Sequence, residues 1–216
     1  MKLVVINYGS GNLRSVAKAF ERAGLDSGWN GQVSVSDDPD ELRRADYIVL
    51  PGVGAFGDCA RGLAAVAGMQ EALSYCVHEK QRPFLGICVG MQLLADRGLE
   101  HGVHPGLGWI SGEVRALTPS QPDLKIPHMG WNTLLLTAAG RAHPALRGLD
   151  DAGDCYFLHS YQFAAANAAD ILAETEYGGH LAAAIGRDNI LGVQFHPEKS
   201  QALGLRLLAN FLRWKL

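Results

Sequence analysis

A cysteine between two glycines is the residue of this chain best placed to do chemistry. Cys88 lies in the run Gly-Ile-Cys-Val-Gly, residues 86–90, between a short apolar segment and a helical pattern. This is the G-x-S-x-G pattern of a strand-to-helix turn that exposes a nucleophile, with Cys in place of Ser. The N-terminus of the following helix would favour the thiolate. We therefore predict that Cys88 is a nucleophile, although a cysteine considered alone is more often a buried structural residue.

A histidine and a glutamate two residues apart could serve that nucleophile. His196 and Glu198 follow a second apolar segment, residues 190–195, and are separated by a proline. Residues i and i+2 of an extended chain point the same way, so the carboxylate can orient the imidazole and stabilise its charged form. Alone, such a pair would more often be a loop histidine beside a surface glutamate. Together with Cys88, it supplies the minimum needed for acyl transfer through a thioester.

A glycine-rich loop after the apolar residues 47–50 is a candidate for stabilising an oxyanion. Functional groups of parallel α/β sheets gather at the carboxyl ends of the strands, where this loop begins. We predict oxyanion donors among the backbone N–H groups of Gly52 and Val53, with the N–H of Val89 as the second donor. Glycines flank Val53, so one peptide of the loop can face away at rest and turn inward later. An ordinary tight turn is the alternative.

The composition restricts the class of protein. The 216 residues have 48% apolar and 19% charged side chains and a net charge of −3, which argues against a nucleic-acid surface and predicts a single domain, 1–216. No apolar run is long enough for a membrane span or a signal peptide, so a cytoplasmic protein is expected. The four cysteines lack C-x-x-C spacing, and Arg14 stands where a dinucleotide fingerprint needs its third glycine. We therefore predict no metal and no cofactor.

The order of the expected elements predicts an α/β fold. Strands and helices alternate as far as Cys88, including a helix over 13–23 that Gly24 ends, and this indicates a doubly wound, largely parallel sheet flanked by helices. After about residue 108 the pattern changes to successive strands, which predict an added, smaller antiparallel sheet region. The expected strands are 112–117, 133–136, 156–163 and 181–185. A helix over 202–214 completes the chain.

These motifs resemble those of the class I (triad) glutamine amidotransferases, whose Cys-His-Glu triad matches Cys88, His196 and Glu198. Other segments narrow the resemblance to the glutaminase subunits of imidazole glycerol phosphate synthases. The Tyr-Gly-x-Gly-Asn and Pro-His-Met-Gly-Trp-Asn segments are the most specific of them. The segments are residues 7–15, 50–57, 127–132, 159–161 and 194–200.

The resemblance implies a reaction and a partner. Glutamine would be hydrolysed to glutamate and ammonia, and the ammonia would pass to a (β/α)8-barrel cyclase subunit, in a heterodimer that serves histidine biosynthesis. The residues implied as substrate contacts are Gly54, Gln92, Glu100, Ser160 and Tyr161. Those implied at the partner interface are Asn12, Trp131 and Lys199, with core packing as an equal alternative for Trp131.

Three other readings stay open at this point. The chain could serve another class I amidotransferase, although the Pro-His-Met-Gly-Trp-Asn segment speaks against this. It could be a stand-alone Cys hydrolase of γ-glutamyl substrates, which would be active without a partner. It could also be a flavodoxin-like binding module without catalysis, which an intact triad disfavours.

Overall fold

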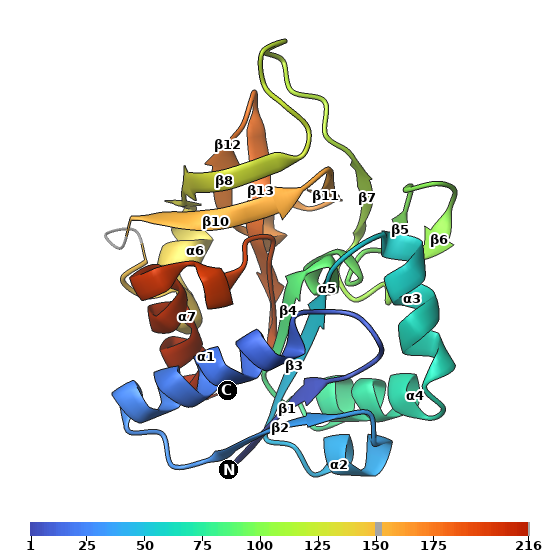
Figure 1. Cartoon of the computed structure of the whole chain (residues 1–216), viewed down its shortest axis with the longest axis vertical. Coiled ribbons are helices and arrows are strands. Elements are labelled where there is room, and N and C mark those ends of the chain that lie inside the picture. Colours follow the sequence, from blue (N-terminus) through green and yellow to red (C-terminus); the bar gives the residue numbers. More distant parts are fainter. Residues whose placement is uncertain (150–152, 216) are drawn as a thin grey trace.

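The chain is built around an eight-stranded sheet (Figure 1). The computed structural model describes residues 1–149 and 153–215. Five neighbouring strands run parallel, in the order β2 (Gln32–Ser36), β1 (Lys2–Ile6), β3 (Tyr47–Gly52), β4 (Phe84–Cys88) and β14 (Ile190–Val193). Three antiparallel strands extend the sheet beyond β14: β13 (His180–Arg187), β12 (Ile171–Glu176) and β9 (Leu135–Leu136).

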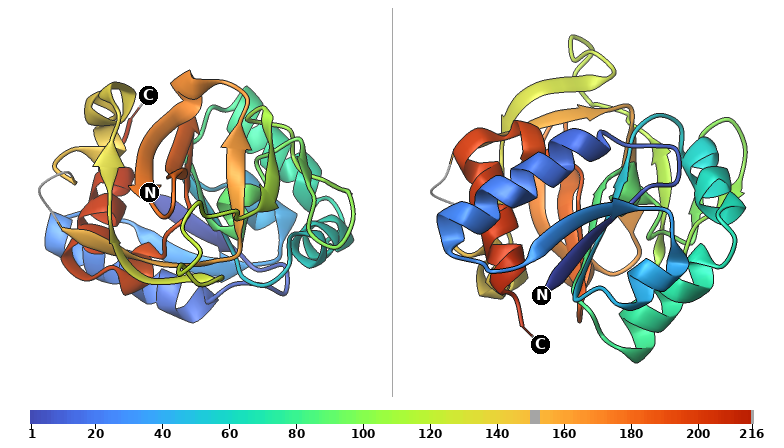
Figure 2. Two further views of the ribbon diagram at one scale, coloured as in Figure 1. Left: turned by 90° about the horizontal axis from the view of Figure 1, so that it is seen from above. Right: turned by 60° about the horizontal axis from the view of Figure 1, so that its bottom comes forward.

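Helices cover both faces of the parallel part, because its four inner strands, β1, β3, β4 and β14, are buried on both sides (Figures 1 and 2). One side carries α1 (Leu13–Ser27) and α7 (Gln201–Arg213), and Phe20 and Phe211 join them with ring centroids 6.0 Å apart. The opposite side carries α3 (Phe56–Ala65) and α4 (Met69–Ser74), which continues into a π-helical turn over Tyr75–Glu79. The short α2 (Pro39–Arg43) precedes β3. In the described residues, no helix is long and apolar enough to cross a membrane.

The second half of the chain adds two small sheets. A ribbon pairs β8 (His128–Thr133) with β10 (Asp154–His159), and a four-stranded sheet has the order β11 (Tyr161–Ala165), β7 (Gly112–Ala116), β5 (Arg97–Gly98), β6 (His104–Pro105). The short helices α5 (Val89–Gln92) and α6 (Ala138–Ala142) and three 3-10 turns complete the part of the chain that the structure describes; the turns are Pro144–Leu146, Ala168–Asp170 and Pro197–Lys199. The predicted fold class is therefore confirmed: a doubly wound, largely parallel sheet with an added antiparallel region.

Several predicted boundaries were wrong. The strand expected over 156–163 is two strands, β10 and β11, which break at Ser160 and belong to different sheets. The strand expected over 133–136 is likewise divided between β8 and β9. In both cases the apolar run continues through a change of sheet. Sequence alone does not show that change, because each partner strand comes from a distant segment.

Helix α1 ends later than predicted, because a side chain packs against the glycine that was expected to end it. Gly24, expected to end the helix, lies inside it, where a Cβ would be 3.2 Å from the Trp29 ring. The helix ends at Ser27 instead and is followed by Gly28 with φ 69°, and the Trp29 N–H donates to the Gly24 carbonyl at 2.9 Å. Gly24 therefore leaves room for the Trp29 ring, whereas Gly28 supplies the left-handed residue at the C-terminus of the helix.

The parallel register brings separate functional segments to one edge of the sheet. Gly52 at the end of β3 pairs with Cys88 at the end of β4, and Val193 of β14 pairs with Ile87. The glycine-rich loop, the nucleophile and the chain leading to His196 thus leave the sheet side by side.

Helix α7 supports the His196 segment through a contact that admits no side chain. A Cβ at Gly204 would lie 1.9 Å from the Pro197 carbonyl oxygen, so Gly204→Ala must move the helix or the 3-10 turn. We expect urea unfolding to show a loss of roughly 1–3 kcal/mol. Helix propensity alone predicts the opposite sign, a gain of about 1 kcal/mol. Ala202→Gly, at an exposed position of the same helix, calibrates the propensity term, and a more stable Gly204→Ala protein would contradict the packing argument.

Candidate active site

Cys88 occupies a strained turn between β4 and the short helix α5 (Val89–Gln92). Its φ of 55° and ψ of −111° are unusual for a residue with a side chain. The flanking glycines make the turn possible, because a Cβ at Gly86 would lie 2.6 Å from the Gly90 carbonyl oxygen and one at Gly90 only 1.8 Å from that of Leu50. The helical pattern that follows Cys88 in the sequence forms only this short helix, which ends at Gln92.

His196 and Glu198 form a buried pair beside this turn. Nδ1 of His196 donates to Oε1 of Glu198 at 2.9 Å, and the two side chains are 4% and 1% exposed. The backbone of His196 is extended and is fixed on both sides: its N–H donates to the Tyr156 carbonyl, and its own carbonyl accepts from the Ser200 hydroxyl at 2.7 Å. Glu198 lies in the 3-10 turn that follows, not in an extended strand.

The surroundings of His196 favour its charged form. Burial lowers its pKa, but hydrogen bonds to Cys88 and Glu198 and the charges of these two groups outweigh burial and raise the pKa to about 9. The second oxygen of Glu198, Oε2, is buried without a hydrogen-bond partner in the described residues. A carboxylate in that position needs a positive neighbour, and the imidazolium supplies it. His196 can therefore hold a proton at neutral pH and give it to a leaving group.

The glycine-rich loop is held by two side chains of the first loop. The Val53 N–H donates to Oγ of Ser10 at 3.0 Å, and the same hydroxyl donates to the Val53 carbonyl at 2.7 Å. The hydroxyl of Tyr8 donates to the Pro51 carbonyl at 2.7 Å. In this conformation the Val53 N–H is engaged with Ser10, so the predicted oxyanion role of Val53 requires its peptide to turn.

A cavity of about 260 Å³ joins these groups. Most of the predicted site residues line it: Cys88, His196, Val53, Val89, Gly54, Gln92, Glu100, Ser160, Tyr161 and Lys199. Gly52 does not, because it packs beneath the loop, where a Cβ would lie 2.7 Å from the Tyr8 hydroxyl. Pro127, Leu158 and His159 line the cavity without having been predicted as site residues.

Two buried glutamines connect the cavity wall to the nucleophile. Nε2 of Gln92 donates to Oε1 of Gln194 at 2.9 Å and to the Tyr161 carbonyl at 3.2 Å. Nε2 of Gln194 then donates to Sγ of Cys88 at 3.6 Å. Sequence reasoning assigned no role to Gln194, and the only signal was its place in the segment that leads to His196.

Glu100 is placed by the start of α3. Its Oε2 accepts the Phe56 N–H at 2.7 Å, which satisfies one of the free donors at the helix N-terminus. Because Glu100 also lines the cavity, it can present negative charge there.

The three predicted interface residues lie at the surface. Asn12 is exposed at the start of α1 and makes no side-chain capping bond. Trp131 is 48% exposed, so the core-packing alternative is wrong. Nζ of Lys199 lies over the Tyr156 ring, 5.5 Å from its centroid.

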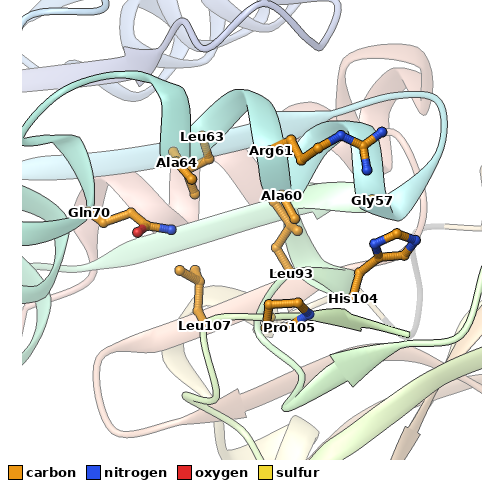
Figure 3. A pocket seen from close by; sticks show the side chains of 11 residues that line it. Gly57, Ala60, Arg61, Leu63, Ala64, Gln70, Leu93, His104, Pro105 and Leu107 are labelled. Atoms are coloured by element: carbon orange, nitrogen blue, oxygen red, sulfur yellow. The ribbon is translucent and has the colours of Figure 1, made fainter. Parts of the chain in front are cut away.

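A second cavity of about 350 Å³ lies apart from this site, between α3 and the chain around β6 (Figure 3). Arg61, Gln70 and His104 stand at its edge, above an apolar floor that includes Leu93 and Leu107. None of the predicted catalytic residues lines it. In the described part of the chain, no group of three or more His, Cys, Asp or Glu side chains could hold a metal ion.

We expect Glu198→Gln to lower the pKa of His196 below 9. The neutral amide supports the charged imidazole less than the carboxylate does, so the lowering of the pKa by burial is less fully offset. An NMR titration of the His196 ring protons measures this, with His196→Gln to assign the signal. Glu113→Gln, which removes a carboxylate from an exposed pair with Arg97, is the control and should change nothing. An unchanged His196 pKa in Glu198→Gln would show that Glu198 does not support the imidazolium.

Comparison with known proteins finds relatives over almost the whole chain. The family described as "Glutamine amidotransferase class-I" matches residues 4–214. The imidazole glycerol phosphate synthase subunit HisH of Rhodospirillum rubrum is 58% identical over 214 residues, covering 99% of each chain. The HisH subunit of Agrobacterium fabrum is 55% identical over 218 residues, covering 100% of both chains.

Solved structures share the fold at low sequence identity. A structure described as a glutamine amidotransferase superimposes with a TM-score of 0.69 at 19% identity, over 97% of each chain. A putative GMP synthase protein from Thermoplasma acidophilum gives 0.66 at 20% identity, over 99% of this chain and 92% of that one. The full-length matches to HisH subunits and the family match together show that this chain belongs to the class I glutamine amidotransferases.

Proposed function

We propose that this chain hydrolyses glutamine at Cys88 and delivers the ammonia to the cyclase subunit of an imidazole glycerol phosphate synthase. Its relatives of more than half identity are named as HisH subunits of that enzyme. The observation that carries the proposal is the strained Cys88 turn, which opens on a cavity beside the buried His196–Glu198 pair.

The first half of the reaction forms a thioester. The Cys88 thiolate attacks the side-chain carboxamide carbon of glutamine, and the carbonyl oxygen takes up negative charge. The His196 imidazolium gives its proton to the amide nitrogen as the carbon–nitrogen bond breaks, so ammonia leaves. Glu198 keeps the proton of Nδ1 in place throughout, which leaves Nε2 to serve the reacting atoms.

The second half releases glutamate. His196, now neutral, takes a proton from water, and the hydroxide attacks the thioester carbon. The carbon–sulfur bond then breaks, and the thiolate and imidazolium are restored. Glu100 would suit the α-ammonium of glutamine, while the chain at Ser160 and Tyr161 forms the facing wall.

We also propose that the glycine-rich loop restrains the free subunit. With its N–H donated to Ser10, Val53 offers no hydrogen bond to the oxyanion, so the intermediate gains less stabilisation. When the partner subunit binds, a rotation of the Gly52–Val53 peptide would free the Val53 N–H and supply that donor to the oxyanion.

An exposed apolar surface beside the cavity supports the proposed partner. Met129 and Leu158 are directly paired across β8 and β10 and are 65% and 37% exposed. Trp131 continues this patch and contacts Tyr156, with ring centroids 5.9 Å apart. Leu158 also lines the cavity, so a partner on the patch would cover the site. We propose that this partner is the (β/α)8-barrel cyclase subunit, in a cytoplasmic heterodimer; the four free cysteines suit a reducing compartment.

Glutamate release from glutamine tests the function directly. We expect weak release by the purified chain alone and a large increase with a cyclase subunit that carries its nucleotide ligand, because only the complex supplies the oxyanion donor. Cys88→Ala is the blank. Strong release without the partner would favour a stand-alone hydrolase instead. Stimulation by a different synthase subunit, with none by the cyclase, would favour another class I amidotransferase.

The docking surface is tested by Trp131→Ala. We expect weaker binding of the cyclase subunit, by ~30-fold or more for a central aromatic contact, measured by titration calorimetry. Leu25→Ala removes an apolar side chain that is 81% exposed on α1, away from the patch, and should leave binding unchanged. Equal binding by wild type and Trp131→Ala would place the interface elsewhere.

A further inference from the structure

Two buried imidazoles stand behind the cavity and take no part in the reaction described above. His128 of β8 and His159 of β10 face each other across the ribbon and are 3% and 6% exposed. Nδ1 of His128 lies 3.0 Å from Nε2 of His159. Burial lowers the pKa of both rings to about 4, so both are neutral at pH 7.

The hydrogen bonds of Asn132 fix which nitrogen of each ring carries the proton. Oδ1 of Asn132 accepts the Thr133 N–H, and Nδ2 donates to the Glu176 carbonyl, both at 2.8 Å, so the amide cannot be reversed. Its Nδ2 also lies 3.2 Å from Nε2 of His128, which must therefore accept.

The same direction of donation, from one group to the next, continues as far as the cavity wall. With Nε2 accepting, the proton of His128 is on Nδ1, from which it donates to Nε2 of His159. The proton of His159 is then on its own Nδ1, which donates to the Tyr161 carbonyl at 2.8 Å. That carbonyl also accepts from Nε2 of Gln92.

Gln92 thereby receives a single orientation. Both protons of its Nε2 are used, one by the Tyr161 carbonyl and one by Gln194, and Gln194 in turn donates to the Cys88 sulfur. Within the described residues, Oε1 of Gln92 has no hydrogen-bond partner, and the side chain lines the cavity. This oxygen is free to accept from an amide or ammonium group of a substrate.

We propose that His159, with its tautomer set by His128, is a positioning residue that fixes the Tyr161 carbonyl and, through it, the Gln92 amide. Gln92 then presents Oε1 to glutamine, and Gln194 presents an N–H to the Cys88 thiolate. This inference rests on the proposed glutaminase function and adds a requirement to it. Packing alone is the competing account, because the His128 ring is stacked against Phe157 and Tyr177, with centroids at 4.8 and 3.9 Å.

Two substitutions of His159 separate the accounts. In His159→Asn the amide nitrogen can take the place of Nδ1 and keep the donor to the Tyr161 carbonyl. In His159→Gln the longer amide can reach the position of Nε2 and keep the contact with His128, but it loses that donor. Each variant thus keeps one of the two hydrogen bonds of His159 and loses the other, and both lose the ring.

We expect His159→Gln to raise the KM for glutamine by about tenfold with a smaller change in kcat, the usual effect of one lost hydrogen bond. The same substitution should also slow the alkylation of Cys88 by iodoacetamide. The rate is measured by mass spectrometry of the peptide that contains Cys88. His159→Asn should stay within about threefold of wild type in both measurements. Thermal unfolding of both variants reports the packing term separately.

Equal effects of the two variants, or no effect of either on KM and alkylation, would overturn the proposal and leave His159 as a packing residue. If His159→Gln does not fold, His128→Asn and His128→Gln provide the same comparison one step earlier, since only Asn keeps the donor at the position of Nδ1. Alkylation does not depend on glutamine turnover. If wild type shows no glutaminase activity even with the cyclase subunit and its nucleotide ligand, the proposed function is refuted, while the alkylation comparison still decides the role of His159.

Discussion

The site depends on holding the backbone of Cys88 at a positive φ, a conformation that costs roughly 1–3 kcal/mol. The residue cannot relax, because β4 is paired in register with β3 on one side and β14 on the other, and all five of its residues are buried. The contact of Gly90 with the Leu50 carbonyl then sets where α5 begins. Strain at Cys88 is thus balanced by a strand bonded on both sides, in the part of the sheet that also aligns the glycine-rich loop and the chain leading to His196.

The partners of each ring, Cys88 and Glu198 in the case of His196, account for the opposite protonation of the imidazoles around the cavity. His159 and His128 are buried without an acidic partner, so burial dominates and lowers their pKa to about 4. His196 is equally enclosed, yet its pKa rises to about 9, because Glu198 and Cys88 both favour the charged ring. The protein therefore keeps a proton on His196, where the proposed reaction needs one, and excludes it from His128 and His159, which we propose position Gln92.

Sequence reasoning succeeded where function and fold share a local pattern. The glycines around Cys88, the spacing of His196 and Glu198, and the strand ends that carry them are all short-range signals, and the α/β fold followed from the same alternation. It failed where distant segments decide the outcome. From the sequence, Gly24 is expected to end the helix, because the packing of Trp29 against it cannot be foreseen. In the sequence, Gln194 and His159 look like ordinary polar residues of strands. Only the structure shows that Gln194 donates to the Cys88 sulfur and that His159 bonds to the Tyr161 carbonyl.

The ribbon of β8 and β10 joins the outer surface to this inner network because its side chains alternate. Met129 and Trp131 point outward from β8, whereas His128 lies inward, and on β10 Leu158 is exposed next to buried His159. Two strands thus carry the apolar patch on one face and the pair of imidazoles on the other. A partner that shifts the ribbon would move the Tyr161 carbonyl as well, and Gln92 follows that carbonyl through a hydrogen bond of fixed polarity. The proposed docking surface and the network that we propose positions Gln92 are therefore carried by the same two strands, on opposite faces.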